Sequence, residues 1–116
     1  MSQDSPTPMQ PLRSTFLDDP EMAELASIFV AELPDHVRTL ESAIAQREWD
    51  GLRRASHRLR GAAGGYGFQP ISDAAGQLED KLRELTKPPE TDADLALVAA
   101  RLRELVALCN RATMAS

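Results

Sequence analysis

The sequence predicts an all-α protein: an antiparallel up-and-down four-helix bundle with an additional short N-terminal helix. Apolar residues recur at spacings of three and four along consecutive segments, which is the period of an amphipathic helix. Aromatic residues make up only 4% of the 116 residues, whereas alanine, leucine, arginine and glutamate are abundant, which favours helices over a sheet. A chain of this length supports one core, so we expect a single domain.

The apolar pattern divides the chain into a tail and a bundle. Residues 1–19 combine three prolines with small polar residues, so we expect a flexible N-terminal tail before a helical bundle domain at 20–113. Pro20 marks the start of the first helix, and Thr91 or Asp92 can cap the last.

Pro34 lies inside the first long apolar pattern. Because proline lacks an amide donor and restricts the residue before it, we expect Pro34 to end or kink one helix and open the next. Glycine and proline runs separate the later helices. The expected helices cover about 19–33, which is the additional one, and then 37–47, 52–64, 71–85 and 92–109.

Charge and cysteine content exclude several classes of function. A net charge of −5 gives no general attraction to phosphate backbones or anionic lipid, so we expect no nucleic acid and no membrane as partner. Cys109, the only cysteine, lies on a helical apolar stripe and is expected to be inert core. No apolar run approaches about 18 residues, and the first residues lack the features of a signal peptide, so we expect a cytoplasmic protein.

His57 is the residue around which a candidate site can be built. It lies two positions before Leu59 of the apolar stripe, about 200° around a helix, so its side chain is expected to point to solvent. Each glycine inside a helix costs about 1 kcal/mol relative to alanine, so glycines on this face suggest that space is needed around the imidazole. The neighbours of His57 at helical contact spacing are Arg53, Arg60, Gly61 and Gly64.

The segment before and after His57 is locally basic. Five arginines, among them Arg53, Arg54 and Arg58, lie between Arg47 and Arg60 against two acidic residues. Such a patch on an acidic protein can steer an acidic partner and stabilise an added phosphoryl group, although surface helices also commonly carry arginines.

Other catalytic constellations are missing from the sequence. His36 and His57 lie on different expected helices, and no histidine, cysteine or acidic cluster has metal-ligand spacing. The glycines at 61–67 lack the pattern of a phosphate-binding loop. We therefore expect no autonomous enzyme, no bound metal and no cofactor.

The residues around His57 resemble the histidine-containing phosphotransfer (HPt) family. The family pattern is a helix carrying His-x-Leu-Lys-Gly, a glycine several residues later, and Leu-Glu or Leu-Gln on the following helix. This chain has a similar pattern in the stretch 55–63, then Gly67, then Leu78-Glu79.

The resemblance implies that His57 accepts a phosphoryl group on Nε2 from an aspartyl phosphate of a receiver domain and passes it to another receiver. It also implies that Glu79 accepts a hydrogen bond from Nδ1–H, which fixes the tautomer and leaves Nε2 free. Arg60 stands where the family most often has lysine, and either cation can neutralise phosphate charge. Gly61 matches the glycine that allows the partner to approach, and Gly67 matches the one at the helix end.

The implied partners are response regulator receiver domains, a hybrid histidine kinase, or both, with the magnesium ion supplied by the receiver. We expect a monomer that docks through the face of His57, with Arg53, Arg54, Arg58, Gly61, Gly64 and Gly67 as further contact residues. Two alternatives stay open: a non-phosphorylated helical adaptor that binds through the same face, and the phosphoacceptor segment of a larger histidine kinase.

Overall fold

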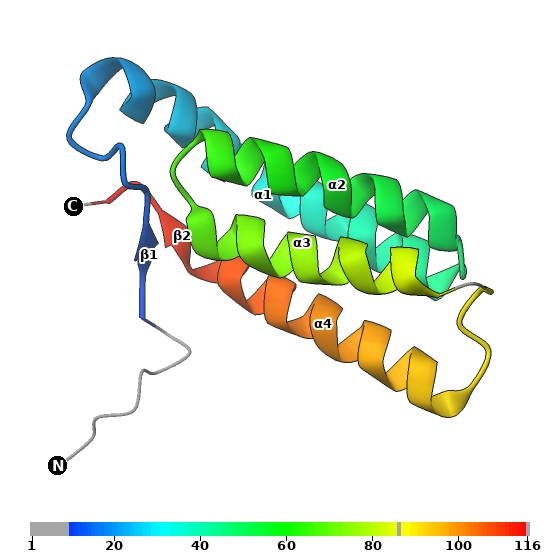
Figure 1. Cartoon of the computed structure of the whole chain (residues 1–116). Helices are drawn as coiled ribbons and strands as arrows, with labels where there is room; N and C mark the ends of the chain where they lie inside the picture. The colour runs from blue at the N-terminus through cyan, green and yellow to red at the C-terminus, as the bar shows by residue number, and fades with distance from the viewer. Residues whose placement is uncertain (1–9, 86, 116) are drawn as a thin grey trace, which may run out of the picture.

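The computed structural model describes residues 10–85 and 87–115, which form a bundle of four antiparallel helices (Figure 1). Consecutive helices pack side by side, and the last helix also packs against the first, so the order is up-down-up-down around one core. The four-helix bundle predicted from the sequence is therefore confirmed. The elements are β1 (Leu12–Arg13), α1 (Pro20–Ala45), α2 (Trp49–Gly65), α3 (Gln69–Glu84), α4 (Asp92–Arg111) and β2 (Ala112–Thr113).

The expected additional N-terminal helix was wrong, because α1 is one helix that continues through Pro34. Leu33 and Leu40, on either side of the proline, are both buried, so the apolar stripe keeps its phase across it. Pro34 itself is exposed, which leaves the carbonyl of Val30 free to be hydrated. Burial of one continuous face therefore outweighs the cost of a proline, about 3 kcal/mol.

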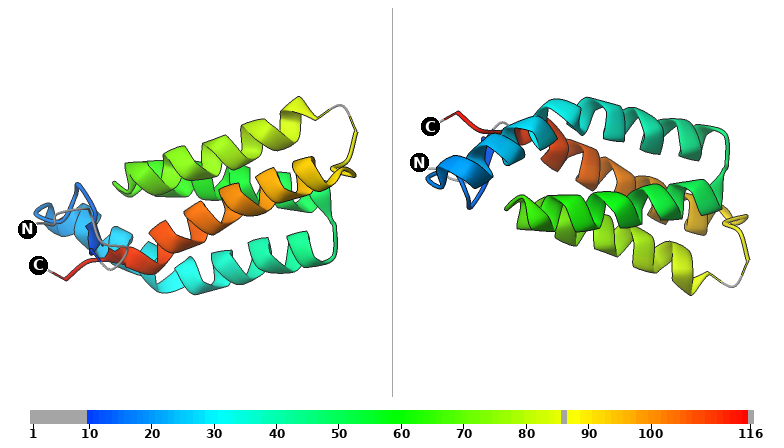
Figure 2. Two further views of the ribbon diagram at one scale, coloured as in Figure 1. Left: turned by 90° about the horizontal axis from the view of Figure 1, so that it is seen from below. Right: turned by 90° about the horizontal axis from the view of Figure 1, so that it is seen from above.

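The first turns of α1 extend beyond the adjacent ends of α2 and α3 (Figures 1 and 2). Asp19 caps this end, since its Oδ1 accepts hydrogen bonds of 3.2 Å from the amides of Glu21 and Met22. Leu25 and Ile28 remain 46% and 53% exposed here. Few neighbouring helix surfaces are present at this end to cover them.

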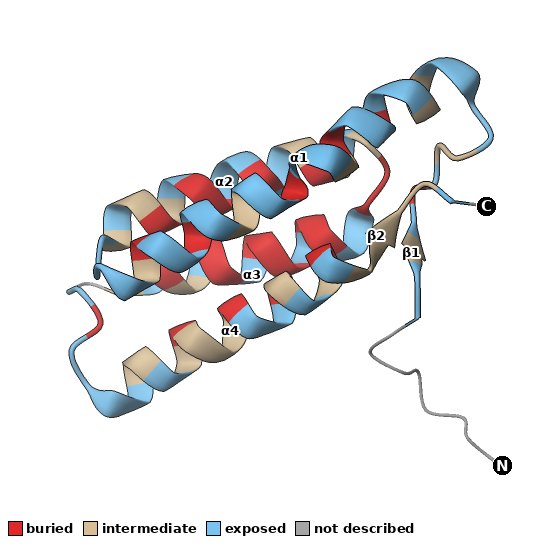
Figure 3. Cartoon of the chain, turned by 180° about the vertical axis from the view of Figure 1, so that it is seen from behind, coloured by how far each residue is buried: buried red, intermediate tan, exposed pale blue. Residues whose placement is uncertain are grey.

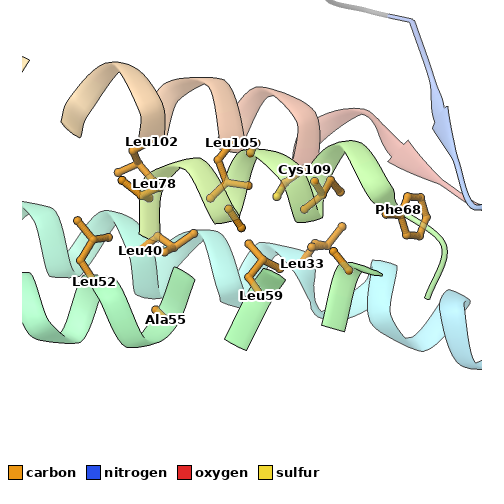
Figure 4. Close-up of a cluster of buried hydrophobic side chains, with 14 of the residues drawn as sticks. Leu33, Leu40, Leu52, Ala55, Leu59, Phe68, Leu78, Leu102, Leu105 and Cys109 are labelled. Atoms are coloured by element: carbon orange, nitrogen blue, oxygen red, sulfur yellow. The ribbon is translucent and has the colours of Figure 1, made fainter. Parts of the chain in front are cut away.

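The core lies where the four helices face one another, as the burial colours show (Figure 3). Cys109 is 5% exposed and packs among the buried apolar residues of the core (Figure 4), so its expected place in the core is confirmed. Burial raises the pKa of its thiol to about 12, which keeps it protonated at neutral pH. Figure 4 labels Leu33, Leu40, Leu52, Ala55, Leu59, Phe68, Leu78, Leu102 and Leu105 around it.

The described part of the N-terminal segment contacts the turn between α2 and α3. β1 pairs in parallel with β2, so residues 12–13 lie beside residues 112–113 (Figure 1). Ser14 Oγ donates a 2.6 Å hydrogen bond to the carbonyl of Tyr66. The amide of Thr15 donates a 2.9 Å hydrogen bond to the carbonyl of Gly67. The expected flexible tail lies partly outside the described residues, at 1–9, and the domain boundary near residue 20 stays a prediction.

The second helix is longer than the apolar pattern indicated. Trp49 and Asp50, expected in a connection, form the first turn of α2, which runs to Gly65. Across the two described ranges, none of the helices has both the length and the apolar character that crossing a membrane requires.

Candidate functional site

His57 lies on the solvent face of α2, with its side chain 64% exposed. Its Nδ1 is 2.8 Å from Oε2 of Glu79, on the neighbouring helix α3. No hydrogen bond joins its Nε2 to another residue of the described ranges. The ring is thus tied to the protein by one nitrogen, while the other is free of protein hydrogen bonds.

Glu79 is a buried carboxylate that three cationic or polar groups share. It is 1% exposed because Leu78 beside it belongs to the core and α2 covers it from the other side. Oε2 accepts a hydrogen bond from His57 Nδ1 at 2.8 Å, and Oε1 accepts one from Nη1 of Arg60 at 3.3 Å. Nη2 of Arg83 forms an ion pair with Oε2 at 2.8 Å. Glu79 is therefore the point where α2 and α3 are joined by polar contacts.

The pKa of Glu79 is lowered despite its burial. Burial is the largest single influence and raises the pKa, but the hydrogen bonds from His57 and Arg60, and the charges of His57 and Arg83, together outweigh it. Glu79 is accordingly ionised at neutral pH. An ionised carboxylate can only accept, so in a neutral His57 ring the proton is on Nδ1 and the lone pair is on Nε2.

Gly61 and Gly64 leave the surface beside His57 open, and both are exposed. A Cβ added at Gly61 would meet no atom within 4 Å, and one at Gly64 would come 3.2 Å from Ser72 Oγ. Neither glycine is demanded by the backbone of α2, since neither has a positive φ. At Gly61 the missing side chain keeps the surface beside the imidazole low, whereas at Gly64 it also makes room for Ser72 of α3.

Gly67 does not belong to this face, which corrects its assignment as a contact residue. It is buried in the turn after α2, with φ of +87°, and a Cβ there would lie 2.5 Å from Ser14 Oγ. The left-handed backbone and the close approach of Ser14 explain the glycine without a partner. Its expected position just beyond the helix end is confirmed.

The arginines predicted as one patch are divided between two faces of α2. Arg60 joins the His57 cluster through Glu79, and its Nη1 also lies 3.8 Å from Asp80 Oδ1. Arg54 and Arg58 instead line a hollow with residues of α1, on the opposite side of α2 from α3. The structure therefore does not bring these two arginines together with His57.

Arg53 and Arg54 are also engaged locally. Nη2 of Arg53 is 2.9 Å from Oδ1 of Asp50, and Nη1 of Arg54 is 2.8 Å from Oδ2. The hydrogen bond from Arg53 and the charge of Arg54 hold the pKa of Asp50 below its ordinary value. Arg53 lies one turn before His57 and lines a hollow between the start of α2 and the end of α3.

Arg83 is a member of the cluster that the sequence analysis missed. It lies one helical turn after Glu79, at the spacing where a glutamate and an arginine pair along a helix. That spacing was the available signal, but it identifies Arg83 only once Glu79 is known to face His57. Within residues 10–85 and 87–115, no group of three or more His, Cys, Asp or Glu side chains is arranged to hold a metal ion.

Comparison with known proteins identifies the family of the chain. The family model of the Hpt domain matches residues 24–111, which include all four helices except the first turn of α1. The chain therefore belongs to the Hpt domain family, whose members act in histidine phosphotransfer of two-component signalling. No curated protein and no solved structure matches the chain significantly.

Proposed function

We propose that this chain is a phosphorelay carrier in which His57 receives a phosphoryl group from the aspartyl phosphate of a receiver domain and delivers it to another receiver. The observation that carries the proposal is the 2.8 Å contact between His57 Nδ1 and the buried carboxylate of Glu79, with Nε2 facing outward. Membership in the Hpt domain family supports the same chemistry.

The transfer step needs no proton movement at His57. The lone pair of Nε2 attacks phosphorus, the bond from phosphorus to the aspartate oxygen breaks, and that carboxylate leaves with the electron pair. Because Nδ1 keeps its proton, the phosphorylated ring carries a positive charge. The ionised Glu79, 2.8 Å from Nδ1, balances that charge, and the reverse step regenerates the neutral ring.

The cationic groups beside His57 suit the phosphoryl oxygens. Arg60 and Arg83 have side chains 49% and 56% exposed, so their guanidinium groups can contact a group on Nε2 while remaining near Glu79. Gly61 and Gly64 give a receiver surface room to approach. The magnesium ion belongs, in this proposal, to the receiver.

The test is the intact mass of the protein after incubation with phosphorylated receiver domains and magnesium. The wild type and His36→Gln should gain one phosphoryl group, and His57→Gln should gain none. His36 is the matched control because it is the other histidine of the chain and lies on α1, outside the cluster. The adduct should be lost in acid and kept in base, as expected for a phosphoramidate.

Three results would lead to a different conclusion. An adduct that persists in His57→Gln would place the phosphoryl group elsewhere. Binding of a receiver without any adduct would favour the helical adaptor. An adduct formed only with ATP and a separate histidine kinase catalytic domain would favour the phosphoacceptor segment of a kinase.

A further inference from the structure

Gly76 of α3 is packed directly beneath the side chain of Arg60. A Cβ added at Gly76 would lie 3.1 Å from Nε, 3.3 Å from Cζ and 3.4 Å from Cδ of Arg60. These distances are shorter than ordinary van der Waals contact between carbon and nitrogen atoms. The arginine side chain therefore lies against α3 so closely that a Cβ at 76 would require it to shift by a few tenths of an ångström.

The hydrogen bond from Arg60 to Glu79 is sensitive to small displacements of the arginine side chain. Its Nη1 reaches Oε1 of Glu79 at 3.3 Å, already near the long limit for a hydrogen bond. A shift of a few tenths of an ångström away from α3 would break it. Arg60 thus reaches Glu79 because glycine at position 76 leaves room for the arginine side chain.

The main chain of Arg60 is fixed separately from its side chain. Ser72 Oγ donates a 2.9 Å hydrogen bond to the carbonyl of Arg60, one turn before Gly76 on α3. The two helices are therefore close at this level whatever residue stands at 76. Addition of a methyl group at 76 should displace only the flexible side chain, not the helix.

We propose that Gly76 is a positioning residue that acts through Arg60 on the orientation of Glu79 and hence of His57. Arg60 holds Oε1, so that Oε2 is turned toward Nδ1 of His57. The expected effect of Gly76→Ala on transfer rests on the proposed function, but the effect on the tautomer of the His57 imidazole can be measured without a partner.

The experiment compares Gly76→Ala with Gly51→Ala, a matched control. Gly51 also lies inside a helix, and its added Cβ would make only an ordinary contact, 3.7 Å from Glu48 Cβ. We expect Gly76→Ala to keep its helicity and melting temperature or to raise the latter, since alanine is the better helix former. Its transfer rate at saturating phosphorylated receiver should fall by about tenfold, as for small misplacements of reacting groups, while Gly51→Ala keeps the wild-type rate.

Two further measurements separate positioning from a general structural effect. The ¹⁵N chemical shifts of His57, recorded where the ring is neutral, should report a loss of the pure Nδ1–H tautomer in both Gly76→Ala and Arg60→Ala. The double variant should transfer no more slowly than Arg60→Ala alone, because Gly76 acts through Arg60.

Each outcome decides the proposal. It is overturned if Gly76→Ala has wild-type transfer and tautomer, or if the double variant is slower than Arg60→Ala. Unchanged tautomer in Arg60→Ala would overturn it even if Gly76→Ala failed to fold. Absence of any phosphoryl transfer to the wild type would overturn the proposed function instead, and the tautomer measurement would still decide the role of Gly76.

Discussion

Replacement of Glu79 by glutamine removes one charge from the polar contacts between α2 and α3 and keeps the size and shape of the side chain. The amide oxygen can still accept from His57 Nδ1, but the amide nitrogen then replaces Oε1. Because that nitrogen is a donor, the hydrogen bond from Arg60 is lost, and the contact with Arg83 loses its ionic character. A hydrogen bond to a charged group contributes about 1.5–3 kcal/mol and an exposed ion pair up to about 1 kcal/mol, so loss of the Arg60 bond and weakening of the Arg83 pair together cost about 2 kcal/mol. Burial of a neutral amide costs less than burial of a carboxylate, and both arginines are half exposed, so we expect a net loss of about 1 kcal/mol in the free energy of unfolding.

The difference between the wild type and Glu79→Gln should depend on pH in one direction. In the folded protein the pKa of Glu79 lies below its ordinary value of 4.5, which applies to the unfolded chain. A carboxyl group with a lowered pKa in the folded state stabilises that state above its unfolded pKa. The stabilisation is lost as the pH falls through the folded pKa, because both states are then protonated.

Urea-induced unfolding followed by circular dichroism measures this effect. The wild type should be more stable than Glu79→Gln near neutral pH, and the two should converge as the solution is acidified below pH 4.5. Glu84→Gln serves as the control, because Glu84 is an exposed glutamate of the same helix. A difference that stays constant or grows on acidification would refute the reasoning, since it could not come from ionisation of Glu79.

Two further substitutions test the backbone. Gly67→Ala should lower the free energy of unfolding by about 1–3 kcal/mol, because φ is +87° and the new Cβ would meet Ser14 Oγ at 2.5 Å; an unchanged urea midpoint would contradict this. Pro34→Ala should raise it by about 1–3 kcal/mol, because it returns an amide donor to the interior of α1 at an exposed position; a less stable variant would show that proline is required there.

The sequence was sufficient to predict the bundle because its signals are local. The apolar period identifies the buried face of each helix, and Thr91, one of the two residues expected to cap the last helix, accepts a 3.0 Å hydrogen bond from the amide of Asp94. The same period placed His57 opposite the core, and its side chain is indeed 64% exposed. Helical spacing also placed Arg60 beside His57, whereas Glu79 was found only through the family resemblance, since its contact with His57 depends on how α2 and α3 pack.

The features that the sequence analysis missed depend on tertiary contacts. A proline is a strong local signal for a helix end, but nothing local reveals that one apolar face continues past Pro34. The separation of Arg54 from Arg60 is likewise set by which helix packs on each side of α2. The pairing of β1 with β2 joins segments about a hundred residues apart, and two residues are too short for a strand pattern.

The cluster beside His57 ties the chemistry of the imidazole to the packing of two helices. A carboxylate as deeply buried as Glu79 is stable only when its donors are in place, so the ion pairs with Arg60 and Arg83 do more than supply charge for a phosphoryl group. A phosphoryl group on Nε2 would compete with Glu79 for the same two guanidinium groups. The positive charge gained by the ring would at the same time strengthen its hydrogen bond to Oε2, so that Glu79 stays satisfied when an arginine turns outward. In the proposed carrier, Glu79 would thus remain ionised and buried in both states, because His57 gains charge when an arginine turns toward the phosphoryl group.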